Sequence, residues 1–324
     1  MSAKKLISFI FPIYNEAETI PQLYVEVLKA IKPLELTYDV ELIFVNDGSK
    51  DDSISLLQDI QQVDTKVKVI GFAANAGHQI AVTAGQDYAT GDAVIIMDSD
   101  LQDPPQVALE LIKKWEEGND IVYARRRSYK THPVKKFYAF LFYRLLKKIA
   151  SVDIPVDTGD FRLLSKRVNT EMKKYKEKSR YLRGMTSLMG YKHAFVEFDR
   201  GERFAGTTNY PFKKSLKLAL NGITGFSTFP LGLITTTGIG LAILSFVGGF
   251  LYIMISLSTR NNVSGWVSLM SVTLFVSGIQ LFMLGIIGEY IGRIYTEVLD
   301  RPLYTIAVKK GFGEEPKETT VQRN

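Results

Sequence analysis

The sequence predicts an α/β domain with a mostly parallel sheet, followed by two transmembrane α-helices. Over the first 130 residues, short apolar runs rich in β-branched residues alternate with longer amphipathic segments, as in a parallel sheet covered by helices. No Asp, Glu, Lys or Arg stands between Lys217 and Arg260, or between Arg260 and Glu289. The 324 residues also exceed the roughly 250 residues at which a single hydrophobic core usually stops growing.

The expected strands and helices follow one another in regular order. Strands are expected at residues 6–12, 40–46, 67–72, 93–97 and 121–124. Helices are expected between them at residues 17–32, 51–63, 77–89 and 104–117, which have helical length and apolar spacing. Because an open parallel sheet binds its ligand beyond the carboxyl ends of its strands, we expect the functional site at that edge.

The two charge-free stretches are expected to cross a membrane. Residues 229–257 and 265–288 are each long enough, since a transmembrane α-helix needs about 20 apolar residues. Two buried helices of a soluble core are the alternative, but such helices rarely run this long without a charge. Only Arg260 stands between the spans, whereas basic residues cluster on their outer flanks. This bias predicts a multi-pass protein with its N-terminal domain and both termini in the cytoplasm.

The same pattern divides the chain into four parts. They are a cytosolic domain at 1–210, a juxtamembrane amphipathic helix at 211–228, a two-helix transmembrane region at 229–290 and a cytosolic C-terminal tail at 291–324. Within the first part, residues 133–150 mix aromatic side chains with lysines and arginines. That mixture fits a helix at an anionic membrane interface, with a packed surface helix as the alternative.

Composition limits the chemistry and the partners. The chain has no cysteine, which excludes disulfides, cysteine nucleophiles and thiolate metal sites. Its net charge of +6 suits an anionic partner, and with two membrane spans we expect lipid and phosphate rather than nucleic acid. The chain has no G-x-x-x-x-G-K motif, so the sequence does not support an ATPase. Gly288 and Gly292 form a G-x-x-x-G pattern that fits helix packing in a homo-oligomer, and equally fits glycines tolerated in a membrane helix.

Polar residues follow the expected strands at the edge where a ligand would bind. Asp98 and Asp100 stand on alternate residues after the fourth strand, and Gln102 comes next. Mg²⁺ and Mn²⁺ prefer oxygen ligands, and Mg²⁺ usually binds through one or two carboxylates plus substrate phosphates. Alone the D-x-D pattern is weak, because an Asp after a strand also caps a following helix. The first two strands end in similarly polar residues, which favours one acidic cleft.

Three of these strand ends carry the resemblance to a known family. F-I-F-P-I-Y-N-E at 9–16, V-N-D-G-S at 45–49 and D-S-D-L-Q-D-P-P at 98–105 resemble the lipid-linked branch of the inverting glycosyltransferases with the A-type fold. The sequence is similar to the bactoprenol glucosyltransferases and also to dolichol-phosphate mannose synthase. The resemblance covers almost the whole chain, including both spans and L-G-I-I-G-E-Y-I-G-R-I-Y-T-E-V-L-D-R-P-L-Y at 284–304.

The resemblance implies a fold and a reaction. The fold is a Rossmann-like nucleotide-sugar domain with a mostly parallel sheet, interfacial helices and two transmembrane helices. The reaction is inverting transfer of a hexose, with glucose expected, from a UDP-sugar donor to polyprenyl (undecaprenyl) phosphate, with Mg²⁺ or Mn²⁺ as the cofactor. The expected location is the cytoplasmic leaflet of the bacterial inner membrane.

The resemblance also implies roles for particular residues. The expected uridine and donor contacts are Pro12, Tyr14, Glu16, Asp47, Asp98 and Arg125. The expected metal ligands are Asp98, Asp100 and Gln102. Residues 156–165 resemble the acceptor loop, in which Asp157 is the expected catalytic carboxylate, and Arg200, Arg203 and Lys213 are expected at the acceptor phosphate. A phosphate monoester is largely ionised at neutral pH, so Asp157 serves either as a base or to orient the acceptor.

Two positions depart from the family pattern, and other functions stay open. Asn46 replaces a usual acidic residue in the uridine loop, and Asn209 stands where a lysine is common. Another sugar, such as mannose or aminoarabinose, is an alternative to glucose. A processive polysaccharide synthase would carry a Q-x-x-R-W motif, which the chain lacks. A non-catalytic membrane scaffold is the alternative from another class, but it would not need acidic residues at every expected strand end.

Overall fold

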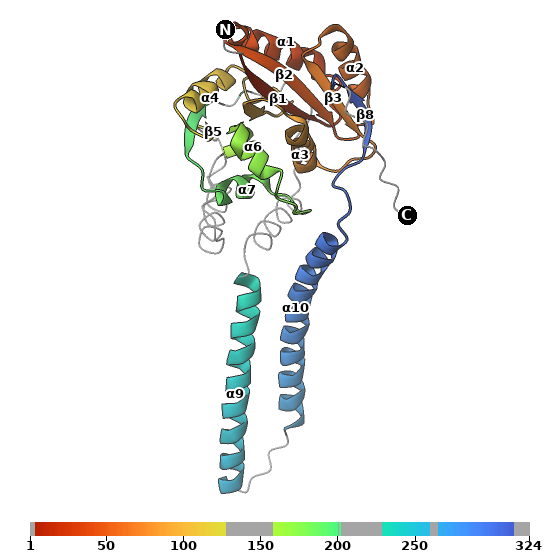
Figure 1. Cartoon of the computed structure of the whole chain (residues 1–324). Coiled ribbons are helices and arrows are strands. Elements are labelled where there is room, and N and C mark those ends of the chain that lie inside the picture. The colour runs from red at the N-terminus through yellow and green to blue at the C-terminus, as the bar shows by residue number, and fades with distance from the viewer. Residues whose placement is uncertain (1–3, 128–157, 200, 202–228, 260–264, 314–324) are drawn as a thin grey trace, which may run out of the picture. The chain divides into compact units, whose positions relative to one another are not determined.

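The computed structural model describes residues 4–127, 158–199, 201, 229–259 and 265–313, in two compact units (Figure 1). One unit, called here the globular unit, comprises residues 1–139, 154–209 and 302–324; the other comprises residues 140–153 and 210–301. The helices expected at 133–150 and 211–228 lie outside the described residues.

The globular unit is built on one eight-stranded sheet in the order β7-β5-β6-β4-β1-β2-β3-β8. The strands are β1 (Lys5–Ile13), β2 (Tyr38–Asn46), β3 (Val67–Phe72), β4 (Ala93–Ile96), β5 (Ile121–Arg126), β6 (Thr158–Ser165), β7 (His193–Phe198) and β8 (Ile306–Lys310). Strands β1 to β5 and β7 run in one direction, whereas β6 and β8 pair antiparallel with their neighbours. The mostly parallel α/β sheet and its five expected strands are confirmed.

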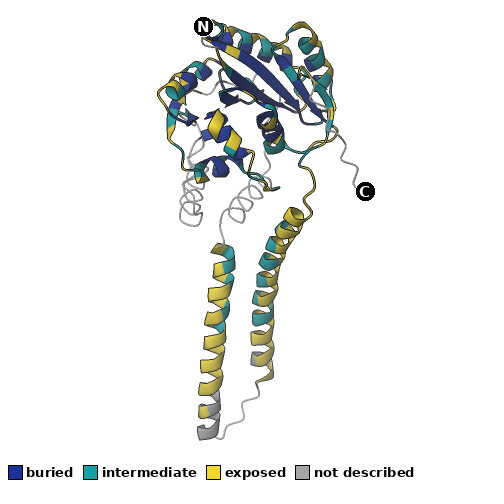
Figure 2. Ribbon diagram, in the orientation of Figure 1, coloured by how far each residue is buried: buried dark blue, intermediate teal, exposed yellow. Residues whose placement is uncertain are grey.

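Helices cover both faces of this sheet. They are α1 (Ile20–Ile31), the 3-10 helix η1 (Leu34–Leu36), α2 (Ser53–Val63), α3 (His78–Tyr88), α4 (Val107–Glu116), α6 (Lys166–Met172) and α7 (Leu182–Leu188). Because side chains alternate along a strand, Phe9 and Phe11 of β1 join the apolar core with α1 and α4, while Ile10 meets α3 at Gly85. The central strands are buried along most of their length, and β1 and β2 fully so towards their carboxyl ends (Figure 2), so they form a rigid base for the residues that follow them.

Two of the strands arise from segments expected to have other structures. Residues 156–165 were expected as a loop, but residues 158–165 form β6 in the middle of the sheet. The C-terminal tail expected at 291–324 contains the last part of α10 and then β8, which pairs with the edge strand β3. Tyr304, just before β8, stacks on Phe72 with ring centroids 5.0 Å apart and donates to Asp87 at 2.9 Å.

The other unit contains two long apolar helices. They are α9 (Phe229–Thr259) and α10 (Trp266–Val298), which confirm the two expected spans as candidate membrane-spanning helices. The stretches Phe229–Leu251 and Leu269–Val298 have mean hydropathies of 1.8 and 2.0. Large apolar side chains such as Phe246 and Leu274 are 78% and 68% exposed in them (Figure 2), an arrangement that suits contact with lipid.

Candidate active site

The residues expected at the nucleotide lie after three neighbouring parallel strands. Strands β4, β1 and β2 are adjacent and parallel, so their carboxyl ends lie at one edge of the sheet. Pro12 is buried within β1, whereas Tyr14, one residue past that strand, is 45% exposed. Asp47 follows β2 directly, and Asp98 follows β4 by two residues. The topology therefore collects these side chains at one edge of the sheet.

The turn after β1 is bonded to the turn after β2. The amide of Asn15, which has a positive φ of 53°, donates to Ser49 Oγ at 2.9 Å, and Asn15 Oδ1 accepts from the Lys50 amide at 2.9 Å. The amide of Glu16 donates to Ser53 Oγ at 3.0 Å. These bonds fix the backbone that follows the exposed Tyr14 ring.

Asp47 organises the loop that leads into α3. Its carboxylate accepts from Asn75 Nδ2 at 2.9 Å, from the Ala76 amide at 2.7 Å and from the Gly77 amide at 2.9 Å. Burial raises the pKa of Asp47, and the hydrogen bonds from the loop offset only part of that effect. Asp47, expected at the uridine, therefore also shapes the adjoining loop.

The D-x-D segment carries two differently placed carboxylates. Asp98 is partly exposed and faces the His78 ring, with Oδ1 and Nε2 3.7 Å apart. Asp100 is 8% exposed, and its Oδ1 accepts from the Gln102 amide at 3.1 Å. Burial raises the pKa of Asp98; His78 opposes this, while the negative charges of Asp160 and Asp100 add to it. The segment is thus a place where a positive charge would be stabilised.

The donor set fits a divalent cation of the Mg²⁺ or Mn²⁺ type. Within the described ranges, no group of three or more His, Cys, Asp or Glu side chains has the geometry of a preformed metal site. Mg²⁺ does not require one, because it commonly binds through one or two carboxylates and completes its coordination with water and substrate phosphates. Asp98 and Asp100 supply two carboxylates, and Gln102 adds an amide oxygen two residues later.

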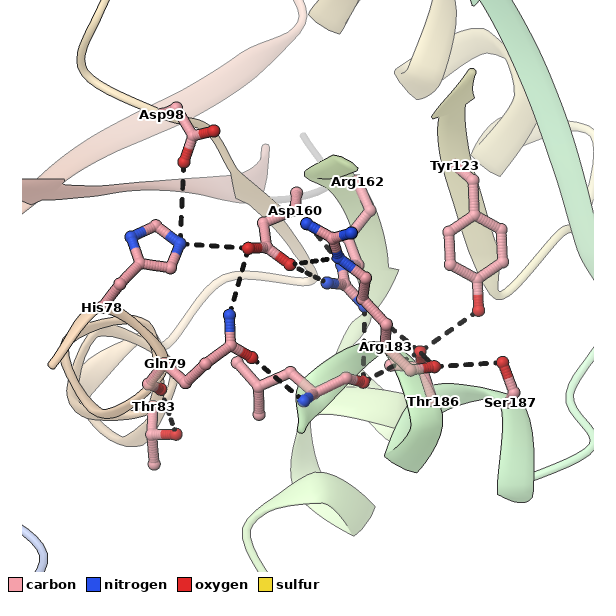
Figure 3. Close-up of polar contacts among 11 residues, drawn as sticks. His78, Gln79, Thr83, Asp98, Tyr123, Asp160, Arg162, Arg183, Thr186 and Ser187 are labelled. Carbon is pink, nitrogen blue, oxygen red and sulfur yellow. Dashed lines mark hydrogen bonds and ion pairs between the residues drawn. The ribbon is translucent and has the colours of Figure 1, made fainter. Parts of the chain in front are cut away.

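Asp160 of β6 is the centre of a buried ionic network (Figure 3). One carboxylate oxygen accepts from Arg162 at 2.8 Å and from Arg183 Nε at 3.0 Å. The other lies 3.1 Å from both His78 Nε2 and Gln79 Nε2. Arg162 is 1% exposed and also donates to the Leu182 carbonyl and to Thr186, so the network joins β6, α3 and α7.

The charges in this network stabilise one another. Burial alone would raise the pKa of Asp160, but the hydrogen bond from His78 and the charges of Arg183 and Arg162 hold it well below its usual range. Burial alone would lower the pKa of His78, but Asp160 and Asp98 outweigh burial and raise it. His78 consequently favours the protonated form between two carboxylates.

Two adjacent arginines at the end of β5 point to different surroundings. Arg125, expected at the donor phosphate, has its guanidinium 3.7 Å from the centroid of the Phe195 ring on β7. Arg126 instead lies 3.6 Å from Asp103 in the segment that follows the D-x-D pair, and its charge acts on Asp98. Neighbouring residues of a strand face opposite sides, so only one of the two arginines faces the acidic segment.

The structure brings together part of the expected site. Tyr14, Glu16, Asp47, Asp98, Asp100 and Gln102 follow neighbouring strands and Pro12 lies near the end of β1, whereas Asp157, Arg200, Arg203 and Lys213 lie outside the described residues. Sequence reasoning missed Asp160 and Arg126. The sequence carried one signal for Asp160: it stands two residues before Arg162, and in a strand two such residues share a face on which they can form an ion pair.

Fold and site together define a class of enzyme, a nucleotide-sugar-dependent glycosyltransferase. The family model described as glycosyl transferase family 2 matches residues 8–172, and the chain belongs to this family. A second model, described as the GtrB C-terminal hairpin, matches residues 238–294, which contain most of α9 and α10.

Individual relatives extend the similarity to nearly the whole chain. YkcC of Bacillus subtilis, described as an uncharacterized glycosyltransferase, is 48% identical over 96% of this chain and 95% of its own length. The bactoprenol glucosyl transferase of Shigella phage SfII is 42% identical over 93% of this chain and 97% of its own length. Among solved structures, glucosyl-3-phosphoglycerate synthase from Mycobacterium tuberculosis, in complex with Mn²⁺, UDP and phosphoglyceric acid, is 19% identical. It aligns with a TM-score of 0.46 over 68% of this chain and 76% of that chain.

Proposed function

We propose that the chain transfers glucose from UDP-glucose to polyprenyl phosphate and forms a lipid-linked sugar. The observation that carries the proposal is the extent of the similarity to bactoprenol glucosyl transferases, which includes both the family 2 domain and the apolar hairpin. A lipid acceptor explains why a nucleotide-sugar domain and long apolar helices occur in one chain, because the polyprenyl tail stays in the bilayer.

The donor binds at the carboxyl ends of β1, β2 and β4. Tyr14 offers an exposed ring for stacking on uracil, and Asp47 follows the neighbouring strand and holds the loop before α3. Asp98 and Asp100 would hold the divalent cation, Mg²⁺ or Mn²⁺, and Arg126 at the end of β5, 3.6 Å from Asp103, would support the diphosphate. The bound cation supplies Lewis-acid stabilisation of the charge that develops on the leaving UDP.

The acceptor half of the site rests on residues outside the described part of the chain. Asp157, the residue before β6, orients the acceptor or takes its proton, and Arg200, Arg203 and Lys213 bind its phosphate. Since a phosphate monoester is already largely ionised at neutral pH, little base catalysis is required. In-line attack on an α-linked donor would invert the anomeric carbon and give a β-linked product.

The membrane arrangement follows from the two apolar helices. α9 and α10 cross the bacterial inner membrane as a hairpin, and the flanking basic residues place the globular unit and both termini in the cytoplasm. The transfer then occurs at the cytoplasmic leaflet. The G-x-x-x-G pattern of Gly288 and Gly292 on α10 offers a close-packing surface for a homo-oligomer.

The test is a transfer assay with purified full-length protein in lipid nanodiscs. We expect radiolabel from UDP-glucose to enter the lipid fraction only when polyprenyl phosphate and Mg²⁺ or Mn²⁺ are present. Asp100→Asn keeps an oxygen acceptor for the Gln102 amide but removes the charge and replaces the other oxygen by an NH2 group, so we expect a loss of at least about 100-fold. Asp59→Asn, on an exposed position of α2, is the matched control and should retain full activity.

Each contrary outcome points to a different error. Equal turnover by Asp100→Asn and the unmodified chain would contradict the metal site. Transfer from another UDP-sugar but not from UDP-glucose would overturn the choice of sugar. No transfer from any UDP-sugar would favour the membrane scaffold.

A further inference from the structure

The side chain of His78 lies between two carboxylates from different strands. Its Nε2 atom is 3.1 Å from Asp160 on β6 and 3.7 Å from Asp98 after β4 (Figure 3). Asp98 belongs to the proposed metal and diphosphate site, whereas neither His78 nor Asp160 has a role in the transfer described above. A single imidazole therefore links the buried network to the D-x-D segment.

We propose that Asp160 and His78 form a positioning pair, in which Asp160 fixes the imidazole and the imidazole holds Asp98 in the orientation needed to bind the metal and the diphosphate. The inference rests on the proposed function, because that function gives Asp98 its role. Neither member of the pair needs to touch the substrate, so both act through Asp98.

Asp160 is suited to hold the His78 side chain in one orientation. It is 6% exposed, and its two oxygens receive four hydrogen bonds from Arg162, Arg183, His78 and Gln79. The donors come from β6, α3 and α7, so any movement of the carboxylate would break contacts with three elements at once. Buried carboxylates with this many charge-assisted bonds have little freedom to rotate.

His78 is suited to transmit that rigidity. It is the first residue of α3, and the loop before it is held by Asp47 through the Ala76 and Gly77 amides, so its backbone is fixed as well. Both neighbours of Nε2 are carboxylates, which accept hydrogen bonds, so Nε2 is the ring nitrogen expected to donate: it lies at hydrogen-bond distance from Asp160, while Asp98 at 3.7 Å makes the longer ionic contact. Rotation of the ring about χ1 would lose both contacts.

Asp98 needs such a partner because nearby charges repel it. Asp160 and Asp100 both act on it with negative charge, while His78 and Arg126 act with positive charge. Without the imidazole, the carboxylate would favour a rotamer closer to water and farther from these neighbours. Groups that orient a metal ligand in this way commonly change metal affinity by about 10- to 100-fold when they are removed.

Gln79, the next residue in the chain, provides a matched control. Its Nε2 donates to the same oxygen of Asp160 at the same distance of 3.1 Å as His78 Nε2. Its other amide atom, Oε1, accepts from the Leu182 amide at 3.1 Å and so faces α7 instead of Asp98. Removing either side chain costs Asp160 one hydrogen bond, but only the His78 change disconnects Asp98.

The experiment compares His78→Ala, His78→Gln and Gln79→Ala in the full-length chain. Calorimetry measures UDP binding with saturating Mn²⁺, electron paramagnetic resonance measures Mn²⁺ binding to the UDP complex, and thermal unfolding measures stability. We expect His78→Ala to weaken both binding steps by about 10- to 100-fold and to raise the KM for the UDP-sugar, with the KM for the lipid unchanged. His78→Gln, which can still donate to Asp160, should recover part of the affinity.

Gln79→Ala should lower the unfolding midpoint, because it disconnects α3 from α7, yet bind UDP and Mn²⁺ within about threefold of the unmodified chain. Equal losses of UDP affinity in His78→Ala and Gln79→Ala would overturn the proposal, since a merely structural network would affect both alike. Unchanged Mn²⁺ and UDP binding in His78→Ala would overturn it as well. Failure of the unmodified chain to bind UDP with Mn²⁺ would instead overturn the proposed function.

Discussion

Replacing Gly48 by alanine tests whether the loop beside Asp47 is as tightly packed as the structure indicates. Gly48 has a φ of +64°, and a Cβ atom there would lie 2.7 Å from both the carbonyl carbon of Ala74 and the amide nitrogen of Asn75. Both are backbone atoms and cannot rotate away. Gly118 also has a positive φ, of +85°, but an added Cβ would meet no atom within 4 Å. The pair separates backbone strain from steric clash.

The expected losses of unfolding free energy follow from the backbone strain and the steric clash. A left-handed conformation costs a residue with a Cβ atom about 1 kcal/mol, and overpacking against fixed atoms costs about 1–3 kcal/mol more. We therefore expect Gly48→Ala to lower the unfolding free energy by about 2–4 kcal/mol, and Gly118→Ala by about 1 kcal/mol. In a domain of this size the unfolding midpoint falls by roughly 2–4 °C per kcal/mol, so the two shifts are separable by thermal scanning.

Gly48→Ala should also weaken UDP binding, because the displaced backbone at Ala74 and Asn75 belongs to the loop that Asp47 holds in front of α3. Circular dichroism during heating and calorimetric titration with UDP measure the two effects on the same samples. Gly118 lies between α4 and the start of β5, away from the carboxyl ends of the strands, so Gly118→Ala should bind UDP normally. Equal midpoint shifts in the two variants, or normal UDP binding by Gly48→Ala, would refute this reasoning.

Three further predictions concern acid stability, the C-terminal strand and the cation. Burial alone would raise the pKa of Glu41, but hydrogen bonds, the largest contribution coming from Lys68, outweigh burial and lower this pKa below 4.5. The ionised Glu41 carboxylate therefore stabilises the fold above that pH, and the stabilisation disappears as acid protonates the carboxylate. Glu41→Gln should therefore be less stable than the unmodified chain at pH 7, and the gap in unfolding midpoint should narrow between about pH 5 and pH 3; a constant gap would contradict this. Tyr304→Phe keeps the stacking on Phe72 and loses the hydrogen bond to Asp87, so it should lower the unfolding free energy of the globular unit by about 1 kcal/mol. Tyr304→Ala loses both contacts and should lower it by about 3 kcal/mol, as measured by denaturant titration. Equal losses in the two variants would argue against the ring contact. Removal of divalent cations with EDTA should abolish transfer, and added Mn²⁺ should restore it; full activity in EDTA would contradict the proposed metal dependence.

The sequence predicts those parts of the fold in which each segment carries the apolar pattern of a single strand or a single helix. Strands β1 to β5 are apolar runs buried on both faces, and the helices between them have apolar residues at helical spacing, so their local patterns agree with the fold. The D-x-D segment was predicted for the same reason, since the end of a parallel strand fixes where Asp98 and Asp100 lie.

The missed elements depend on partners distant in sequence. β6 contains Asp160 and Arg162, charges that would disfavour a buried strand if they did not pair with each other and with α3 and α7. β8 ends in lysines, and Lys309 lies over the Tyr88 ring at 4.5 Å from its centroid. The contacts of β6 with α3 and α7, and of Lys309 with Tyr88, join residues distant in sequence and cannot be read from local periodicity. The continuation of α10 to Val298 is a local feature instead, in which Glu289 and Arg293 form an ion pair one turn apart.

The proposed transfer depends most on a cation held by Asp98 and Asp100 after β4, and one crystallographic measurement tests that directly. Crystals of the full-length chain grown with Mn²⁺ and UDP should give an anomalous peak about 2.0–2.2 Å from oxygens of Asp98 or Asp100 and from the diphosphate. The His78 ring should remain against Asp98 in the same density. A peak bound by other side chains, or UDP bound at the strand ends with both carboxylates turned away from it, would contradict the proposed site.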